Sequence, residues 1–206
     1  MIKNNIQNKL IFLIKILLIS LFFSISINAS EQNAKGEFIT FGTNNAPIKI
    51  KVFSSLTCPH CADFHIKVIP KLKGYVDAGK VQIIFIDFPL DQAAFNASKL
   101  LHCLDNKKQM KFLDSIYENQ KEWVSGSTID QINNNLKKIV KSFGIDEVEF
   151  DKCVNNDVIS DKILNGRIDA HKKYSIDSTP TVVINEKKLT GPSNFKNIKK
   201  KIEKNI

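Results

Sequence analysis

Arginine is almost absent from this sequence. The formal net charge is +9, yet Arg167 is the only arginine among 30 basic residues. Sites that recognise phosphate groups or nucleic acid favour arginine, because its planar guanidinium binds phosphate oxygens in pairs. The many lysines therefore predict solvated surface faces, and we expect no nucleic-acid partner.

Cysteine is also scarce, and the few cysteines present exclude two kinds of metal site. Structural zinc usually needs two close pairs of ligands, but only Cys58 and Cys61 are close in sequence. A c-type haem site requires a histidine directly after the second cysteine, where Ala62 stands. We therefore predict that the protein uses no metal and no cofactor.

The N-terminus has the pattern of an export signal. Two lysines precede an apolar stretch over residues 10–27, and Ala29 offers a small-residue cleavage site. This pattern predicts a secretory signal peptide over residues 1–29. An uncleaved membrane anchor is the alternative, although Lys15 interrupts a stretch of borderline length for spanning a bilayer.

The chemistry of the chain is concentrated in a Cys-Pro-His-Cys motif at residues 58–61. The motif follows a strand-like run, residues 48–54, and precedes a helical pattern. A helix N-terminus stabilises a thiolate, so that a thiol pKa can fall from ~8.5 to ~3.5–7.5. We therefore predict that Cys58 is the reactive thiolate, that His60 stabilises it, and that Cys61 is the resolving thiol. A purely structural bridge would close too small a loop to contribute much stability.

The four cysteines could form disulfides in three different pairings. Closeness in sequence favours a Cys58–Cys61 pair, which leaves Cys103 and Cys153 as the second candidate pair. His65 follows Cys61 by one helical turn. Because a catalytic histidine needs a geometric partner, we predict that His65 is packed or solvated rather than catalytic.

The periodicity of apolar residues predicts a β-α-β unit, then a long helical region, then an α-β-β-α unit. The expected strands cover residues 38–41, 48–54, 81–86, 182–184 and 187–190. One helix is expected over residues 59–78, with a kink or break at Pro70. Further helices are expected near residues 91–104, 107–120, 129–142, 146–155, 157–174 and 193–204.

This order of elements predicts an α/β protein with a thioredoxin-like fold that is interrupted by an all-helical domain. We expect the first thioredoxin-like part over residues 37–90 and the helical insertion over residues 91–157. The second thioredoxin-like part is then expected over residues 158–206.

In these motifs the sequence resembles the DsbA-like thiol:disulfide oxidoreductases of bacterial envelopes, in particular the alphaproteobacterial type. The resemblance is carried by residues 55–61, 88–90 and 176–185, and it extends over most of the chain after residue 29. It implies that Pro180 is cis beside the active-site sulfurs, and that the Thr179 backbone pairs with a substrate peptide by strand addition.

The same resemblance implies a second, non-catalytic disulfide between Cys103 and Cys153. The sequence departs from the family pattern at Val52, where members usually carry a buried acid that helps to move the proton of the buried thiol. Either another group serves this role here, or the proton is carried by water.

The function implied by the resemblance is that of a monomeric periplasmic oxidase, which introduces disulfide bonds into exported cysteine-containing proteins. A DsbB-type membrane quinone reductase would re-oxidise it. A disulfide isomerase or reductase is the first alternative: Thr179 favours it, but residues 30–37 are too short for a dimerisation domain. A chaperone-like binding module without turnover is the second alternative.

Overall fold

The computed structural model describes residues 38–205 of the chain. The predicted signal peptide, residues 1–29, lies outside the described residues. No helix within residues 38–205 is long and apolar enough to cross a membrane.

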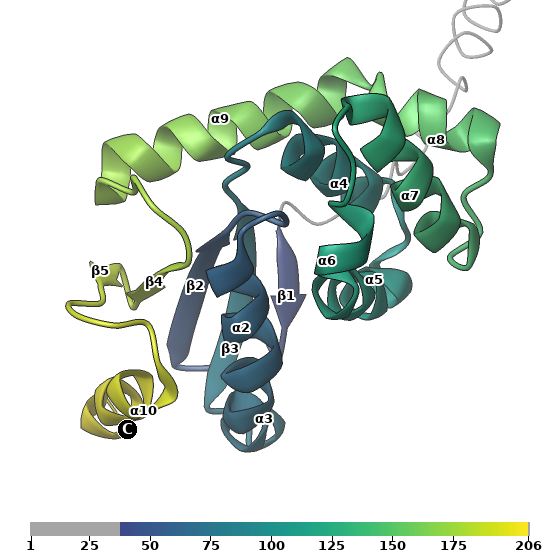
Figure 1. Cartoon of the computed structure of the whole chain (residues 1–206). Coiled ribbons are helices and arrows are strands. Elements are labelled where there is room, and N and C mark those ends of the chain that lie inside the picture. The colour runs from purple at the N-terminus through teal and green to yellow at the C-terminus, as the bar shows by residue number, and fades with distance from the viewer. Residues whose placement is uncertain (1–37, 206) are drawn as a thin grey trace, which may run out of the picture. The chain divides into compact units, whose positions relative to one another are not determined.

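A five-stranded mixed sheet forms the centre of the fold (Figure 1), with the strands in the order β1-β3-β2-β4-β5. Strands β2 and β3 are parallel, and the other neighbouring pairs are antiparallel. The strands are β1 (Ile39–Phe41), β2 (Ile48–Ser54), β3 (Val81–Asp87), β4 (Thr181–Ile184) and β5 (Lys187–Lys188).

The two central strands are buried on both faces. Val52 and Phe85 belong to the larger core, which extends to the helices on one side of the sheet. Phe53 and Ile86 belong to a smaller core that packs against α9 (Asp157–Tyr174). Because both faces are covered, β3 is a nearly continuous apolar run in the sequence, whereas β2 alternates with lysines up to Lys51 and becomes apolar at Val52 and Phe53.

The single helix expected over residues 59–78 is divided into two. Helix α2 (Pro59–Lys67) ends before Val68, and α3 (Ile69–Asp77) begins immediately after it. Pro70 lies in the first turn of α3, where its missing N–H leaves no helical hydrogen bond unmade. The predicted interruption at Pro70 is therefore a break, and both helices lie against the sheet (Figure 1).

The region between β3 and β4 contains helices and no strand among the described residues. The sequence predicted five of these helices and missed the short α6, which begins where the helix expected over residues 107–120 ends. The helices of this region are, in chain order, α4 (Gln92–Cys103), α5 (Asn106–Glu118), α6 (Gln120–Trp123), α7 (Ile129–Lys141), α8 (Glu147–Val154) and α9. The fold is thus a thioredoxin-like α/β fold with a helical insertion, which confirms the predicted fold class.

The chain ends in a hairpin and a helix. Asn185 and Glu186 connect β4 to β5 with φ values of 44° and 65°, as a tight two-residue hairpin turn requires. The return strand β5 is shorter than the expected 187–190. Helix α10 (Phe195–Asn205) then buries Ile198 and Ile202 in the larger core.

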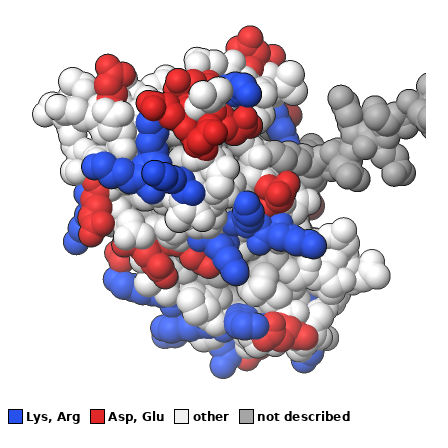
Figure 2. Space-filling view, turned by 90° about the vertical axis from the view of Figure 1, so that its right-hand side faces the viewer, with Lys and Arg blue, Asp and Glu red and all other residues white. Residues whose placement is uncertain are grey.

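Charge is mixed over the face of the molecule in Figure 2. Lysine and arginine side chains form several separate groups there, with aspartate and glutamate between them. On this face the basic composition therefore produces no continuous basic surface, in agreement with the solvated lysines that the sequence predicts.

Candidate active site

The first cysteine of the motif lies at the start of α2. Cys58 is the N-cap residue of that helix, and Pro59 occupies the first helical turn. The Cys58 N–H donates to the Ser55 carbonyl at 3.1 Å, and its Sγ donates to the Thr179 carbonyl at 3.4 Å. The sulfur is therefore held between the positive end of the α2 dipole and the loop that precedes β4.

The second cysteine lies one helical turn deeper and is almost inaccessible. Cys61 is 1% exposed and belongs to the larger core, whereas Cys58 is 9% exposed. Burial raises the pKa of the Cys61 thiol to about 12, although the Thr179 hydroxyl and the Ser55 backbone partly oppose this rise. Both cysteines are free thiols in the structure. The geometry thus provides one sulfur that is slightly exposed and one deeper sulfur that favours its protonated form.

The Thr179–Pro180 peptide bond is cis and lies against the motif. Beside it is a groove of about 560 Å³ between the start of α2 and the hairpin region. Residues that line the groove include His60, Phe64, Pro180, Leu189 and Pro192. The lining mixes these apolar side chains with polar and charged ones such as Asp63, Lys67 and Lys188, and the groove is open enough for an extended peptide to lie in it.

His60 lies beside the motif at the edge of the groove, and its thiolate-stabilising role stays a prediction. Its side chain is exposed and lines the groove. No hydrogen bond joins its ring to Cys58 within residues 38–205. The structure therefore brings together Cys58, Cys61, Thr179 and Pro180, and it places His60 at the rim.

The loop before the motif is anchored by residues that the sequence did not single out. Gln120 of α6 is 6% exposed, and its Nε2 donates to the carbonyls of Leu56 at 2.8 Å and Cys58 at 3.0 Å. The Thr57 hydroxyl donates to Asp91, the N-cap residue of α4, at 2.6 Å. These contacts span more than thirty positions of the chain, and no local pattern identifies them.

His65 is packed, as the sequence predicts. Its Nε2 lies 2.7 Å from Asp114 Oδ1, and its ring centre lies 4.8 Å from that of Tyr117. The His65 side chain is 6% exposed, while Asp114 is 52% exposed. This pair joins α2 to α5 and orients the helix that carries the motif.

The second cysteine pair is a disulfide in the helical region. Cys103 ends α4 and Cys153 lies in α8, with a Cα–Cα distance of 6.0 Å and 50 positions between them in sequence. Cys153 is buried at 1% exposure. The bond therefore connects two helices of the insertion and lies outside the groove and the motif.

A Cys-x-x-Cys pair at a strand-to-helix junction, opposite a cis-proline loop in this fold, defines the class of thiol–disulfide oxidoreductases. A family model described as thioredoxin matches residues 34–204, and the chain belongs to that family. Among curated proteins it is 30% identical over 176 residues to the "Probable disulfide bond formation protein D" of Bacillus anthracis, covering 81% of this chain and 77% of that protein.

Solved structures extend the same likeness. The alpha-DsbA1 of Wolbachia pipientis is 30% identical, with a TM-score of 0.73 over 81% of this chain and 89% of that one. The BdbD protein of Bacillus subtilis, at 20% identity and a TM-score of 0.68, shows the shared fold alone. These matches confirm the DsbA-like resemblance, and the protein is a protein-disulfide oxidoreductase.

Proposed function

We propose that this protein is a dithiol oxidase of the periplasm, which introduces disulfide bonds into exported proteins through Cys58 and Cys61. The observation that supports this most strongly is the unequal pair of sulfurs. Cys58 lies at the helix N-terminus against Thr179, and Cys61 is buried with its pKa raised to about 12. Such an asymmetry suits one sulfur for attack by substrate and the other for departure.

The proposed exchange has two steps. A substrate thiolate attacks Cys58 Sγ of the oxidised pair, the Cys58–Cys61 bond breaks, and Cys61 leaves and takes up a proton. A second substrate thiolate then attacks the substrate sulfur of the mixed disulfide, so that Cys58 leaves as a thiolate. The substrate dithiol is oxidised to a disulfide, and the Cys58–Cys61 pair is reduced to a Cys58 thiolate and a Cys61 thiol.

The helix N-terminus supports an oxidising role, because it stabilises the thiolate that is released in the second step. Stabilising the reduced form of a dithiol pair makes its disulfide a stronger oxidant. Pro59 occupies the first helical turn, where its missing N–H would have no helical partner, so it costs α2 no hydrogen bond.

Substrate binding is proposed to use the Thr179 backbone and the adjacent groove. An extended peptide would pair with the chain at Thr179 and place apolar side chains along Phe64 and Leu189. The proposed substrates are therefore unfolded exported chains that carry two cysteines. His60 at the rim would contact such a peptide.

The proposed location and partners follow from the export pattern and the DsbA-like relatives. We infer cleavage of a signal after Ala29, a monomeric protein, and re-oxidation by a DsbB-type quinone reductase. We also propose that the working parts divide into residues 37–90, 91–157 and 158–206, with the helical part covering one side of the motif.

A disulfide isomerase or reductase is the second candidate, because the residue before the cis-proline is Thr179, a residue type that the resemblance associates with isomerases. The reduction potential of the Cys58–Cys61 pair distinguishes the two functions. Protein lacking residues 1–29 is equilibrated with glutathione buffers, and the reduced fraction is measured. A potential near −120 mV is expected for the oxidase, while about −200 mV or below would favour the isomerase or reductase.

A further inference from the structure

A second groove lies between the β4–β5 hairpin and α10, which are neighbours in Figure 1. It has a volume of about 200 Å³, and Ile184 and Leu189 contribute to its apolar lining. No aspartate or glutamate of residues 38–205 lines it. Four lysines do, and they give this lysine groove its name: Lys187, Lys188, Lys201 and Lys204. The charged side chains that the described chain places around this concave surface are therefore all positive.

The charges of these lysines are not neutralised by neighbouring groups. The ammonium groups of Lys187, Lys201 and Lys204 form no ion pair and no hydrogen bond within the described residues. Lys188 Nζ donates to the Ser175 carbonyl at 2.7 Å, and this neutral acceptor leaves the lysine charge uncompensated.

The glutamates next to these lysines in sequence are held by other lysines. Glu186 in the hairpin turn pairs with both Lys51 and Lys173. Glu203 of α10 lies 3.5 Å from Lys199. The lysine groove therefore keeps its positive charge, and a negatively charged partner would find complementary electrostatics there.

Each pair of lysines has an ordinary explanation when it is considered alone. Lys187 and Lys188 form β5, the edge strand of the sheet, and lysines on an edge oppose pairing with other chains. The lysines of α10 keep the exposed face of an amphipathic helix in water. Neither explanation accounts for the meeting of both pairs at one groove. Lys196 and Lys200 of α10 are also exposed and do not line it.

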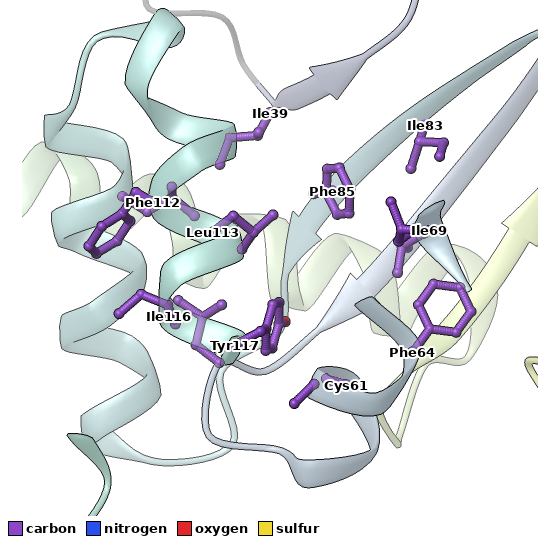
Figure 3. Close-up of a cluster of buried hydrophobic side chains, with 14 of the residues drawn as sticks. Ile39, Cys61, Phe64, Ile69, Ile83, Phe85, Phe112, Leu113, Ile116 and Tyr117 are labelled. Carbon is purple, nitrogen blue, oxygen red and sulfur yellow. The ribbon is translucent and has the colours of Figure 1, made fainter. Parts of the chain in front are cut away.

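The lysine groove continues the groove beside the motif. Lys188 and Leu189 line both grooves, and the Leu189 N–H donates to the Val182 carbonyl at 2.8 Å, which holds the shared wall against β4. Figure 3 shows Phe64 on the side of α2 that is turned away from Tyr117, and Phe64 lines the groove beside the motif. A peptide that leaves the motif along the first groove therefore meets Lys188 and enters the lysine groove.

Strand β4 indicates the length of this path. It begins at Thr181, directly after the cis-proline, and ends at Ile184, which lines the lysine groove. The four residues of the strand span three steps, or ~10 Å at ~3.3 Å per residue. An extended peptide bonded to Cys58 would thus place its third and following residues beside the lysines.

The first groove has little charge preference of its own. Asp63 and Lys67, which both line it, form an ion pair with a distance of 2.5 Å between Oδ1 and Nζ. Because these two charges cancel, selection by charge is left to the lysine groove.

We propose that the lysine groove binds an acidic segment of the substrate chain, about three to six residues from the cysteine that bonds to Cys58. Lys201 and Lys204 are its specificity-determining residues. This inference rests on the proposed exchange at Cys58 and Cys61, and it narrows the substrates to exported chains that carry aspartate or glutamate near a cysteine.

The first test compares two reduced dithiol peptides that differ only in the segments flanking their cysteines, which are glutamates in one and glutamines in the other. Oxidised protein lacking residues 1–29 is mixed with each peptide, and the second-order rate of peptide oxidation is measured. We expect the glutamate peptide to react about tenfold faster in dilute salt, because each exposed lysine–carboxylate contact contributes up to about fivefold. The difference should largely disappear at about 1 M salt, where screening acts over ~3 Å.

The second test reverses the charges of the α10 lysines in the groove. Lys201→Glu/Lys204→Glu should lower the ratio of the two rates from about ten to about one or less. The matched control is Lys196→Glu/Lys200→Glu, which changes the net charge equally on the same helix but outside the lysine groove. Its ratio should stay within about twofold of the wild-type ratio, and cooperative thermal unfolding checks that both variants are folded.

The third test measures binding without exchange. Labelled copies of both peptides carry serine in place of cysteine, and fluorescence anisotropy gives their affinities for the protein. Tighter binding of the glutamate copy, weakened about tenfold by Lys201→Glu/Lys204→Glu, supports the proposal whether or not exchange occurs. A protein that shows this preference but oxidises neither dithiol peptide would refute the proposed function alone.

Three results would overturn the proposal. The first is equal binding of both copies by the wild type. The second is an equal loss of preference in both double variants, because net charge alone would then explain it. The third is co-sedimentation with phosphatidylglycerol vesicles that only Lys201→Glu/Lys204→Glu abolishes, without any preference between the peptides, which would assign the lysine groove to a membrane surface.

Discussion

The two cysteine pairs of this protein have the same chemistry and opposite settings. Cys58 and Cys61 are separated by two residues, lie at a helix N-terminus beside an open groove, and are free thiols. Cys103 and Cys153 are separated by 50 positions and join two helices as a disulfide. The difference shows that loop length and surroundings decide what a cysteine pair does, because a short loop contributes little stability and a long one contributes several kcal/mol.

The sharpest way to test this division is to remove each pair in turn. Cys58→Ser should abolish measurable oxidation of a reduced dithiol peptide, because substrate has no accessible sulfur to attack. The Cys103→Ala/Cys153→Ala double variant should retain turnover within a few-fold of the wild type. The assay mixes oxidised protein with a stoichiometric amount of the reduced peptide and measures how many peptide disulfides form. A double variant without activity, although folded, would show that the two pairs act together.

The second prediction concerns stability. Loss of the Cys103–Cys153 bond should lower the free energy of unfolding by about 4 kcal/mol, the loop-closure value for a loop of this length. Reducing Cys58 and Cys61 alone should have a smaller effect, since their loop is short. Denaturant unfolding of the double variant and of the wild type, both with the first pair reduced, measures the difference. A loss below about 1 kcal/mol would contradict a structural role for the bond.

The third prediction is that the stability of the reduced protein depends on pH through the Cys58–Cys61 pair. The Cys61 pKa is about 12 in the folded protein, compared with an ordinary value of 9.0. As pH rises above 9, the unfolded chain therefore releases this proton while the folded chain retains it, and stability falls. Reduced wild type should lose about 2 kcal/mol by pH 10.5 relative to reduced Cys61→Ser. Parallel stability curves for the two proteins would refute the buried-thiol assignment.

The smallest predicted effect concerns the contact that connects the helical region to the motif. Gln120→Met removes the donor to Leu56 and Cys58 at similar volume and should cost about 1–2 kcal/mol. It should also slow exchange at Cys58, because the loop before the motif loses its anchor. Gln109→Met is the matched control, since Gln109 is equally buried and its Nε2 donates at 3.4 Å to the carbonyls of Leu101 and Leu104, which are not part of the motif loop. Equal exchange rates in both variants would show that the anchor does not position Cys58.

The sequence predicted those features that depend on local patterns. Strand β2, the start of α2 and the motif between them follow from apolar periodicity and from Pro59 at the first helical turn. The break at Pro70 follows in the same way, from a missing N–H. The short α6 was missed because it has only four residues and is separated from α5 by Asn119 alone.

The rest of the site depends on contacts between distant segments. The bonds from Gln120 to the motif loop and the Asp87–His102 pair join α6 and α4 to the sheet ends. Their residue types are common on protein surfaces, and a sequence shows neither their burial nor their partners. The place of His60 in the motif was likewise evident from the sequence, but that its side chain lines the groove was not.

The most direct test of the division between the pairs measures both in one titration. Protein lacking residues 1–29 is equilibrated with glutathione buffers of graded potential, free thiols are alkylated, and each pair is quantified by mass spectrometry of its peptides. The account predicts that Cys58 and Cys61 become reduced in mild buffers in which Cys103 and Cys153 remain bonded. Reduction of both pairs at the same potential, or of Cys103 and Cys153 first, would contradict it.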